Sequence, residues 1–332
     1  MRYTRLGGDG PQVSVAGLGC AAISGSYGHT DRDESVELLR AALDAGITLL
    51  DVGDYYGMGA GELLIAEALR GRRREDVIIS VKFGGLRDPS GRWLGHDVSP
   101  TAAKVAIGYT LTRLGTDYVD VYRPGRIEPG VPVEETIGAI GELVDAGYVR
   151  HIGLSEVGAE TLRRASAVRP ICDLQIEYSL ISRGIETAIL PSCRELNVAI
   201  TAYGVLARGL LSGRWTAGRA LERGDGRARH PRFQPENLER NLALVEALQE
   251  VARARGATVA QLAVAWVASG GEEIVPLLGA KRREQLEELL GGLALELSSD
   301  ELGEIERAVP PYAVAGSRYP PAILATLDSE TR

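Results

Sequence analysis

Short apolar runs alternate along most of the chain with longer segments in which apolar residues recur every three or four positions. A short apolar run predicts a buried strand, and the longer repeat predicts an amphipathic helix. The expected strands lie at 15–19, 49–51, 77–82, 118–122, 149–154, 171–176, 198–203 and 273–278. The expected helices lie at 34–45, 61–69, 100–114, 132–146, 159–167, 186–196, 236–255, 259–269 and 282–290.

Strands that alternate with helices are typical of α/β folds with a parallel sheet. Eight such units predict a (β/α)8 TIM barrel, with residues 1–332 as one domain. Residues 2–15 predict an N-terminal β-hairpin, and long loops, among them 83–98 and 208–235, are expected at the C-terminal face. An open doubly wound sheet is the main rival. It is disfavoured because the run 17–22 lacks the third glycine of a dinucleotide-binding turn.

Two neighbouring strands each end in a charged residue, and the loop after the first carries a tyrosine. These residues are Asp51, Lys82 and Tyr56. In this fold, catalytic groups gather at the C-terminal ends of strands and in the loops that follow. A phenol ionises near pH 10, roughly, and a nearby ammonium is expected to lower that pKa. The three residues therefore predict a proton donor for a carbonyl oxygen that is being reduced by hydride transfer.

Composition restricts the classes of partner. A formal net charge of -8 and a pI of about 5.3 argue against nucleic acid and anionic membranes as general partners. The 3 cysteines lack the spacing of a zinc site and the number of a disulfide framework, and we expect no metal. No apolar run reaches the length of about 18 residues needed to span a membrane. Without a secretory signal pattern near Met1, we expect a cytoplasmic protein.

Segments spread in order over nearly the whole chain resemble the aldo-keto reductase superfamily. The first is Leu50-Asp51-Val52-Gly53-Asp54-Tyr55-Tyr56-Gly57, followed by Lys82. The others lie at 117–120, 147–155, 174–178, 202–213 and 275–281. This resemblance implies an NADPH-dependent oxidoreductase that reduces an aldehyde or ketone to an alcohol. It also implies a small-molecule carbonyl substrate and leaves a homo-oligomer open.

The resemblance assigns roles to residues that match the family pattern. Tyr56 would be the general acid, and Asp51 and Lys82 would tune it. Residues that would contact the nicotinamide are Ser155, Gln175 and Tyr203. Residues whose backbone would follow the pyrophosphate are Gly204, Val205, Leu206, Arg208, Gly209 and Leu210. Residues that match the adenosine end are Gly279, Lys281, Gln285 and Glu288, with Lys281 as the partner of a 2′-phosphate.

The chain departs from the family pattern at three positions. Gly125 stands where the family usually carries a histidine just after the fourth strand. Glu156 replaces an asparagine after Ser155, and Leu289 replaces another after Glu288. The first departure concerns the chemistry, because glycine can neither orient a carbonyl nor donate a proton.

Loss of a donor at Gly125 predicts either a slow generic reductase or a pocket in which another donor compensates. Arg123, His96 and His29 are the candidates for that donor. The space freed at Gly125 is expected to admit a bulkier or cyclic substrate. Loop aromatics expected to line the substrate pocket, or else to pack in the core, are Tyr27, Trp93 and Trp215. Tyr55, next to Tyr56, is interpreted as pocket wall.

Two other functions stay open at this point. The chain could bind NADPH as a sensor or interaction protein with weak or vestigial activity. It could also catalyse a redox-neutral reaction with the same tyrosine as acid or base.

Overall fold

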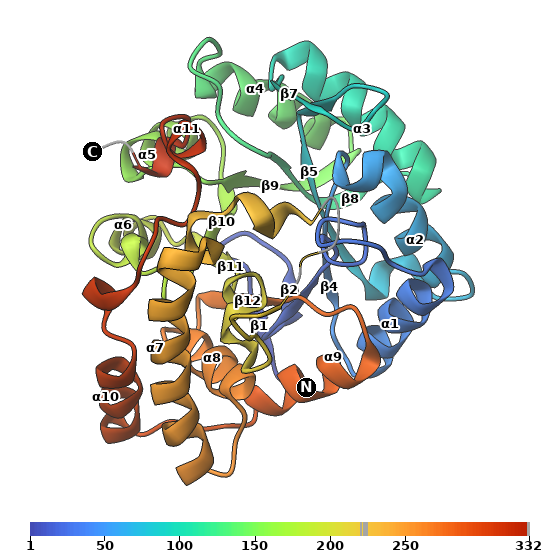
Figure 1. Cartoon of the computed structure of the whole chain (residues 1–332). Coiled ribbons are helices and arrows are strands. Elements are labelled where there is room, and N and C mark those ends of the chain that lie inside the picture. The colour runs from blue at the N-terminus through green and yellow to red at the C-terminus, as the bar shows by residue number, and fades with distance from the viewer. Residues whose placement is uncertain (220, 222–224, 331–332) are drawn as a thin grey trace.

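The apolar runs form short strands that are largely buried. In the computed structural model, which describes residues 1–219, 221 and 225–330, eight of these strands close into a parallel barrel (Figure 1). They are β3 (Gly17–Gly19), β4 (Leu49–Gly53), β5 (Ile78–Phe83), β8 (Val119–Pro124), β9 (Val149–Ser155), β10 (Ile171–Glu177), β11 (Ala199–Tyr203) and β12 (Ile274–Leu278). Each strand pairs with its neighbours in chain order, and β12 pairs with β3 to close the ring. The predicted (β/α)8 barrel is confirmed.

The predicted amphipathic segments form helices that surround the strands (Figure 1). They are α1 (Arg32–Asp44), α2 (Ala60–Ala68), α3 (Pro100–Leu114), α4 (Val133–Asp145), α5 (Ala159–Val168), α6 (Ile189–Glu195), α7 (Pro235–Ala254), α8 (Val259–Ala268) and α9 (Arg283–Gly292). Two further helices, α10 (Ser299–Ala308), which packs against α7, and α11 (Pro321–Leu324), were not predicted. Local chemistry sets their ends. Helix α3, for example, begins where the Ser99 hydroxyl accepts a hydrogen bond from the Ala102 amide and ends at Gly115, whose φ is 65°.

The loops after the strands contain more regular structure than the sequence pattern predicted. The expected loop 83–98 contains a hairpin of β6 (Gly85–Arg87) and β7 (Trp93–His96). The expected loop 208–235 contains the short 3-10 helices Ala207–Ser212, Gly226–Arg229 and Pro231–Phe233. Positions 220, 222–224 and 331–332, within that loop and at the end of the predicted domain, lie outside the described residues.

The predicted N-terminal hairpin is present as β1 (Tyr3–Arg5) and β2 (Gln12–Ser14), and it covers the barrel end opposite to the strand C-termini. The Gly8 amide donates to the Asn197 carbonyl at 2.8 Å, just before β11 begins. Leu6 is fully buried within an apolar cluster inside this end of the barrel. The members of that cluster are Leu6, Val13, Leu49, Val121, Cys172, Ala199, Val275 and Leu277.

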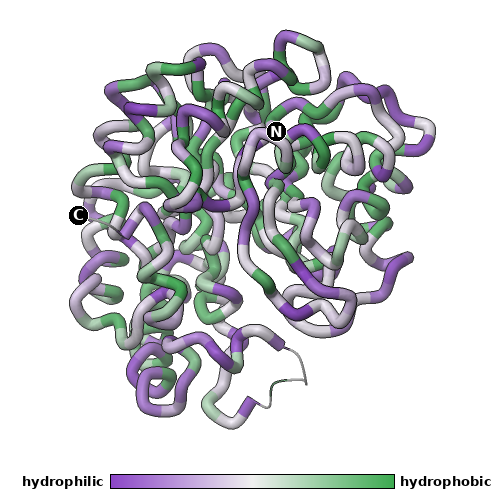
Figure 2. The backbone as a smooth tube through the Cα atoms, turned by 90° about the horizontal axis from the view of Figure 1, so that it is seen from above, coloured by the Kyte–Doolittle hydropathy of each residue, from purple (hydrophilic) through white to green (hydrophobic). Residues whose placement is uncertain are grey.

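Hydrophobic and hydrophilic residues alternate in short blocks along the chain (Figure 2). Such alternation is expected when each helix turns one face to the barrel and the other to water. None of the helices in the described part of the chain has the length and apolar character needed to cross a membrane.

We predict that Leu6→Ala lowers the free energy of unfolding by about 2–5 kcal/mol, because it leaves a cavity where the hairpin meets the barrel. Urea unfolding followed by circular dichroism measures the change. Leu63→Ala is the matched control, since Leu63 is 49% exposed on α2. Equal losses in the two variants would contradict the role given to the hairpin.

Candidate active site

Asp51 and Lys82 form a buried ion pair inside the barrel. Lys82 Nζ lies 2.6 Å from Asp51 Oδ2, and their side chains are 3% and 5% exposed. The two residues meet because β4 and β5 are paired neighbours. From the opposite side of the barrel, Gln175 on β10 donates its amide N–H to Asp51 Oδ1 at 2.7 Å. The carboxylate is therefore held from two directions, and the ammonium is fixed by it.

Tyr56 begins the 3-10 helix Tyr56–Gly59 that follows β4. Lys82 Nζ lies 5.1 Å from the centre of its ring. Burial raises the pKa of Tyr56 well above its usual value, and Asp51 raises it further. The expectation that Lys82 lowers this pKa is not met, because Asp51 compensates the ammonium charge. Tyr56 is a protonated phenol at neutral pH.

A cavity of about 1020 Å³ opens at the C-terminal ends of the strands and contains Asp51, Tyr56 and Lys82. Most of the residues that the sequence assigned to a cofactor or substrate also line it. They are Tyr27, Ser155, Gln175, Tyr203, Gly204, Val205, Leu206, Arg208, Gly209, Gly279, Lys281, Gln285 and Glu288. Leu210 is an exception, because it is 1% exposed and packs in the hydrophobic core.

The loop after β11 carries backbone conformations that L-residues rarely adopt. Ala207 has a φ of 48° and Arg208 a φ of 59°, next to Gly209 at 95°. Strained backbone of this kind clusters at ligand sites, where turns direct N–H groups toward an anion. The Arg208 guanidinium turns to Glu177, with 3.2 Å between Nη2 and Oε2.

Lys281 links the loop after β12 to the loop after β3. Its Nζ donates to the Tyr27 carbonyl at 2.7 Å and to the His29 carbonyl at 3.2 Å. Its backbone N–H donates to Gln285 Oε1 at 2.9 Å. The ammonium therefore lies at one end of the cavity, where these backbone carbonyls hold it.

Arg123 lies beneath the cavity and not on its wall, in contrast to the sequence-based expectation. Its side chain is 0% exposed and contacts both carboxylate oxygens of Asp173, at 2.8 and 3.0 Å. Asp51 Oδ1 is 3.5 Å from its Nη1. Arg123 therefore compensates buried carboxylates and is not placed to contact a substrate.

Trp93 and His96, also expected in the substrate pocket, form a layer behind Tyr55. The Trp93 ring meets the Tyr55 ring edge-on at 5.8 Å between centres, and His96 packs on Trp93 at 4.8 Å. Burial lowers the pKa of His96 to about 4, and Arg126 contributes to the shift. His96 is therefore neutral at physiological pH.

The space expected to be free at Gly125 is filled. A Cβ atom added to Gly125 would lie 3.0 Å from the Tyr55 hydroxyl oxygen and 3.1 Å from the Phe83 carbonyl oxygen. The proposal that this glycine makes room for a bulkier substrate is therefore wrong.

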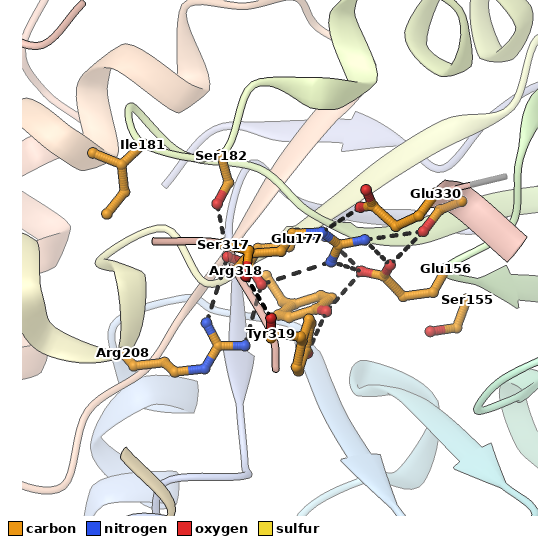
Figure 3. A network of polar contacts seen from close by, with 12 residues as sticks. Ser155, Glu156, Glu177, Ile181, Ser182, Arg208, Ser317, Arg318, Tyr319 and Glu330 are labelled. Atoms are coloured by element: carbon orange, nitrogen blue, oxygen red, sulfur yellow. Dashed lines mark hydrogen bonds and ion pairs between the residues drawn. The ribbon is translucent and has the colours of Figure 1, made fainter. Parts of the chain in front are cut away.

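A buried network ties the C-terminal tail to the cavity (Figure 3). Glu156, just after β9, receives two hydrogen bonds from Arg318, at 2.5 and 2.9 Å. The Tyr203 hydroxyl donates to the same carboxylate at 2.6 Å and lies 2.8 Å from the Tyr319 hydroxyl. Burial alone would raise the pKa of Glu156, but Arg318, Arg126 and Tyr203 outweigh it and lower the pKa to about 2.

Comparison with known proteins identifies the family of the chain. Residues 16–310 match the model of the aldo/keto reductase family. The chain belongs to this family. It is 39% identical over 320 residues to "Probable aldo-keto reductase 1" of Glycine max, covering 95% of this chain and 91% of that protein. It is 37% identical over 322 residues to "Aldo-keto reductase yakc [NADP(+)]" of Schizosaccharomyces pombe, covering 96% and 94%.

Solved structures of aldo-keto reductases show the same fold. The glycerol dehydrogenase AKR11B4 from Gluconobacter oxydans superposes with a TM-score of 0.84 at 28% identity, covering 93% of this chain and 96% of that one. The holo form of AKR11C1 from Bacillus halodurans gives a TM-score of 0.77 at 27% identity, covering 94% and 97%.

This aldo-keto reductase has cavity residues that the sequence did not assign. Arg126 lines the cavity and donates to the Gly125 carbonyl at 2.7 Å. Its place directly after Gly125 was a signal that could have found it. Tyr319 also lines the cavity, but it comes from a tail without periodicity, and no sequence signal marks it.

We predict that Glu156→Gln costs about 3 kcal/mol of stability at neutral pH, because it removes one partner of a buried ion pair. Since folding lowers the pKa of Glu156, its contribution is complete above about pH 4.3, the usual pKa of Glu. That contribution is lost as pH falls toward about 2. The difference in unfolding free energy between wild type and variant should therefore shrink from pH 5 to pH 3, roughly.

Urea titrations at several pH values measure this difference. Glu134→Gln is the matched control, because Glu134 pairs with Arg164 on the surface, where both side chains are more than a third exposed. A pH-independent difference between wild type and Glu156→Gln would count against the ion pair as its source.

Proposed function

We propose that this chain is an NADPH-dependent reductase of aldehydes or ketones, with Tyr56 as general acid. The observation that carries the proposal is the Asp51–Lys82 ion pair beside Tyr56, inside a cavity of about 1020 Å³. A protonated phenol next to a compensated ammonium is suited to donate to an oxygen on which negative charge develops. The family of the chain supports the same activity.

The residues present fit a dinucleotide. The strained loop 207–209 offers backbone donors, and a Cβ added to Gly279 would meet nothing within 4 Å, so a ligand can approach the backbone there. The ammonium of Lys281 is suited to a 2′-phosphate. When bound, the reduced nicotinamide would supply the hydride. The NADP(+) in the name of the Schizosaccharomyces pombe relative supports this choice.

Three side chains near the expected nicotinamide position differ in the hydrogen bonds they can make to it. Gln175 has committed one N–H of its amide to Asp51, which leaves its carbonyl oxygen and its second N–H for a carboxamide. Glu156, in place of the family's asparagine, is committed to Arg318 and Tyr203. Ser155, at the end of β9 on the cavity wall, is the other candidate contact.

The chemistry of Tyr56 follows from its protonation state. Its hydroxyl would hydrogen-bond the substrate carbonyl oxygen and polarise the carbon toward hydride attack. As the oxygen gains negative charge, it becomes a stronger base than a phenolate and takes the proton. Lys82 would then stabilise the tyrosinate, while Asp51 keeps the ammonium in place.

We predict that Tyr56→Phe lowers kcat for aldehyde reduction by a factor on the order of 10²–10⁴, because the proton donor is removed. NADPH oxidation with 4-nitrobenzaldehyde and cyclohexanone measures the rate, and fluorescence titration should show unchanged NADPH affinity. Tyr109→Phe is the control, since Tyr109 is 62% exposed on α3.

Other results would favour the other functions. Tight NADPH binding by the wild type without turnover would support a cofactor sensor. Turnover without net NADPH oxidation would support a redox-neutral enzyme.

We predict that Lys281→Met raises the Kd for NADPH by roughly 10- to 100-fold, the value of a charge-assisted hydrogen bond, and changes the Kd for NADH much less. Titration of both nucleotides tests the preference. Arg283→Met is the control, because Arg283 pairs with Glu287 at 2.8 Å on the surface of α9. An equal rise in the Kd values for NADPH and NADH would show that Lys281 is not the source of a preference for NADPH.

A further inference from the structure

The Tyr55 ring lies in a slot bounded by three glycines from three separate segments. An added Cβ would lie 3.2 Å from Tyr55 Cζ at Gly53, 2.6 Å from Cδ1 at Gly85, and 3.0 Å from the hydroxyl oxygen at Gly125. None of the three glycines has a positive φ, so the backbone does not require glycine there. A side chain at any of the three positions would therefore meet the Tyr55 ring, together with Tyr56 at Gly53 and Trp93 at Gly85.

The slot aims the Tyr55 hydroxyl at the position that the family pattern gives to histidine. Any side chain at Gly125 would start within contact distance of this hydroxyl oxygen. Tyr55 also lines the cavity that holds Tyr56 and Lys82. The Tyr55 and Tyr56 rings are perpendicular, at 88°, with centres 5.1 Å apart, so both reach the same part of the cavity.

The Tyr55 hydroxyl is available as a donor. Within the described part of the chain it makes no hydrogen bond, and its ring is held from behind by Trp93. Burial raises the pKa of Tyr55, so the hydroxyl is protonated at neutral pH.

We propose that Tyr55 is a second catalytic residue, whose hydroxyl donates a hydrogen bond to the substrate carbonyl oxygen in place of the missing histidine. The proposal rests on the proposed carbonyl reductase function. It makes Tyr55 and Gly125 one coupled feature: the tyrosine supplies the donor, and the glycine leaves room for it. Tyr56 remains the group that transfers the proton, because it lies beside Lys82.

The other candidates for this donor are placed less well. His29 lines the cavity at the end where its carbonyl accepts from Lys281. His96 packs on Trp93 and is not among the residues that line the cavity. Arg123 is enclosed with Asp173 inside the barrel. Arg126 faces the cavity but donates to the Gly125 carbonyl.

Tyr55→Phe keeps the ring in its slot and removes only the hydroxyl. We expect kcat for 4-nitrobenzaldehyde reduction to fall by about 10²-fold, as when one donor to a developing oxyanion is removed, with the Kd for NADPH unchanged. Gly125→Ala should give a similar loss, because its Cβ displaces the hydroxyl. The double variant Tyr55→Phe/Gly125→Ala should lose little more than either single variant, since both remove the same hydrogen bond.

A rescue tests the exchange of donors. In the Tyr55→Ala background, Gly125→His should restore kcat by about tenfold or more, because the imidazole can enter the emptied slot as a new donor. Gly138→Ala is the control for a glycine substitution, since a Cβ at Gly138 meets nothing within 4 Å.

The outcomes separate this proposal from the proposed function. A kcat of Tyr55→Phe within about threefold of wild type would be too small a change for a lost oxyanion donor. If Tyr56→Phe is inactive at the same time, the role of Tyr55 is overturned and the reductase function stands. Strictly additive losses in the double variant would also overturn the coupling of Tyr55 and Gly125. A wild type that reduces no aldehyde or ketone would overturn the reductase, and the role of Tyr55 with it.

Discussion

The buried ion pair between Asp51 and Lys82 joins two neighbouring strands at the centre of this barrel. Its two residues belong to adjacent strands, and the carboxylate also receives Gln175 from the opposite wall. An ionised pair with so little solvent contact is stable only when each charge is compensated and its remaining hydrogen-bonding positions are filled. The same requirement that fixes the pair also fixes the position of Tyr56 relative to an ammonium group.

Compensation of buried charge extends one layer deeper. Arg123 lies between the Asp51 and Asp173 carboxylates, and Thr201 donates to Asp173 at 2.6 Å. The two aspartates, Asp51 and Asp173, thus meet the two cationic side chains of Lys82 and Arg123 inside the barrel, and their formal charges cancel. This explains why Arg123 is absent from the cavity wall: its charge is needed inside the barrel, where an unpaired aspartate would be costly.

The cavity wall is assembled from segments that are distant in sequence. Arg318 reaches Glu156 across 162 positions and brings Tyr319 against Tyr203 (Figure 3). Three glycines from separate segments make the slot for Tyr55. Glu156 finds its partner, Arg318, in the C-terminal tail. For Gly125 we propose Tyr55 in the corresponding role.

The sequence by itself predicted the barrel from local periodicity, and the rule that strand ends carry the chemistry placed Asp51 and Lys82 together at one end of it. The family resemblance selected Tyr56 beside them. The sequence also contains a signal for α10, the Ser298–Glu301 capping box, although no helix was predicted there. The positions of Arg123, Tyr319 and Tyr55 were decided only by the tertiary structure. Each depends on the volume or charge of residues far away in the chain, which no local pattern records.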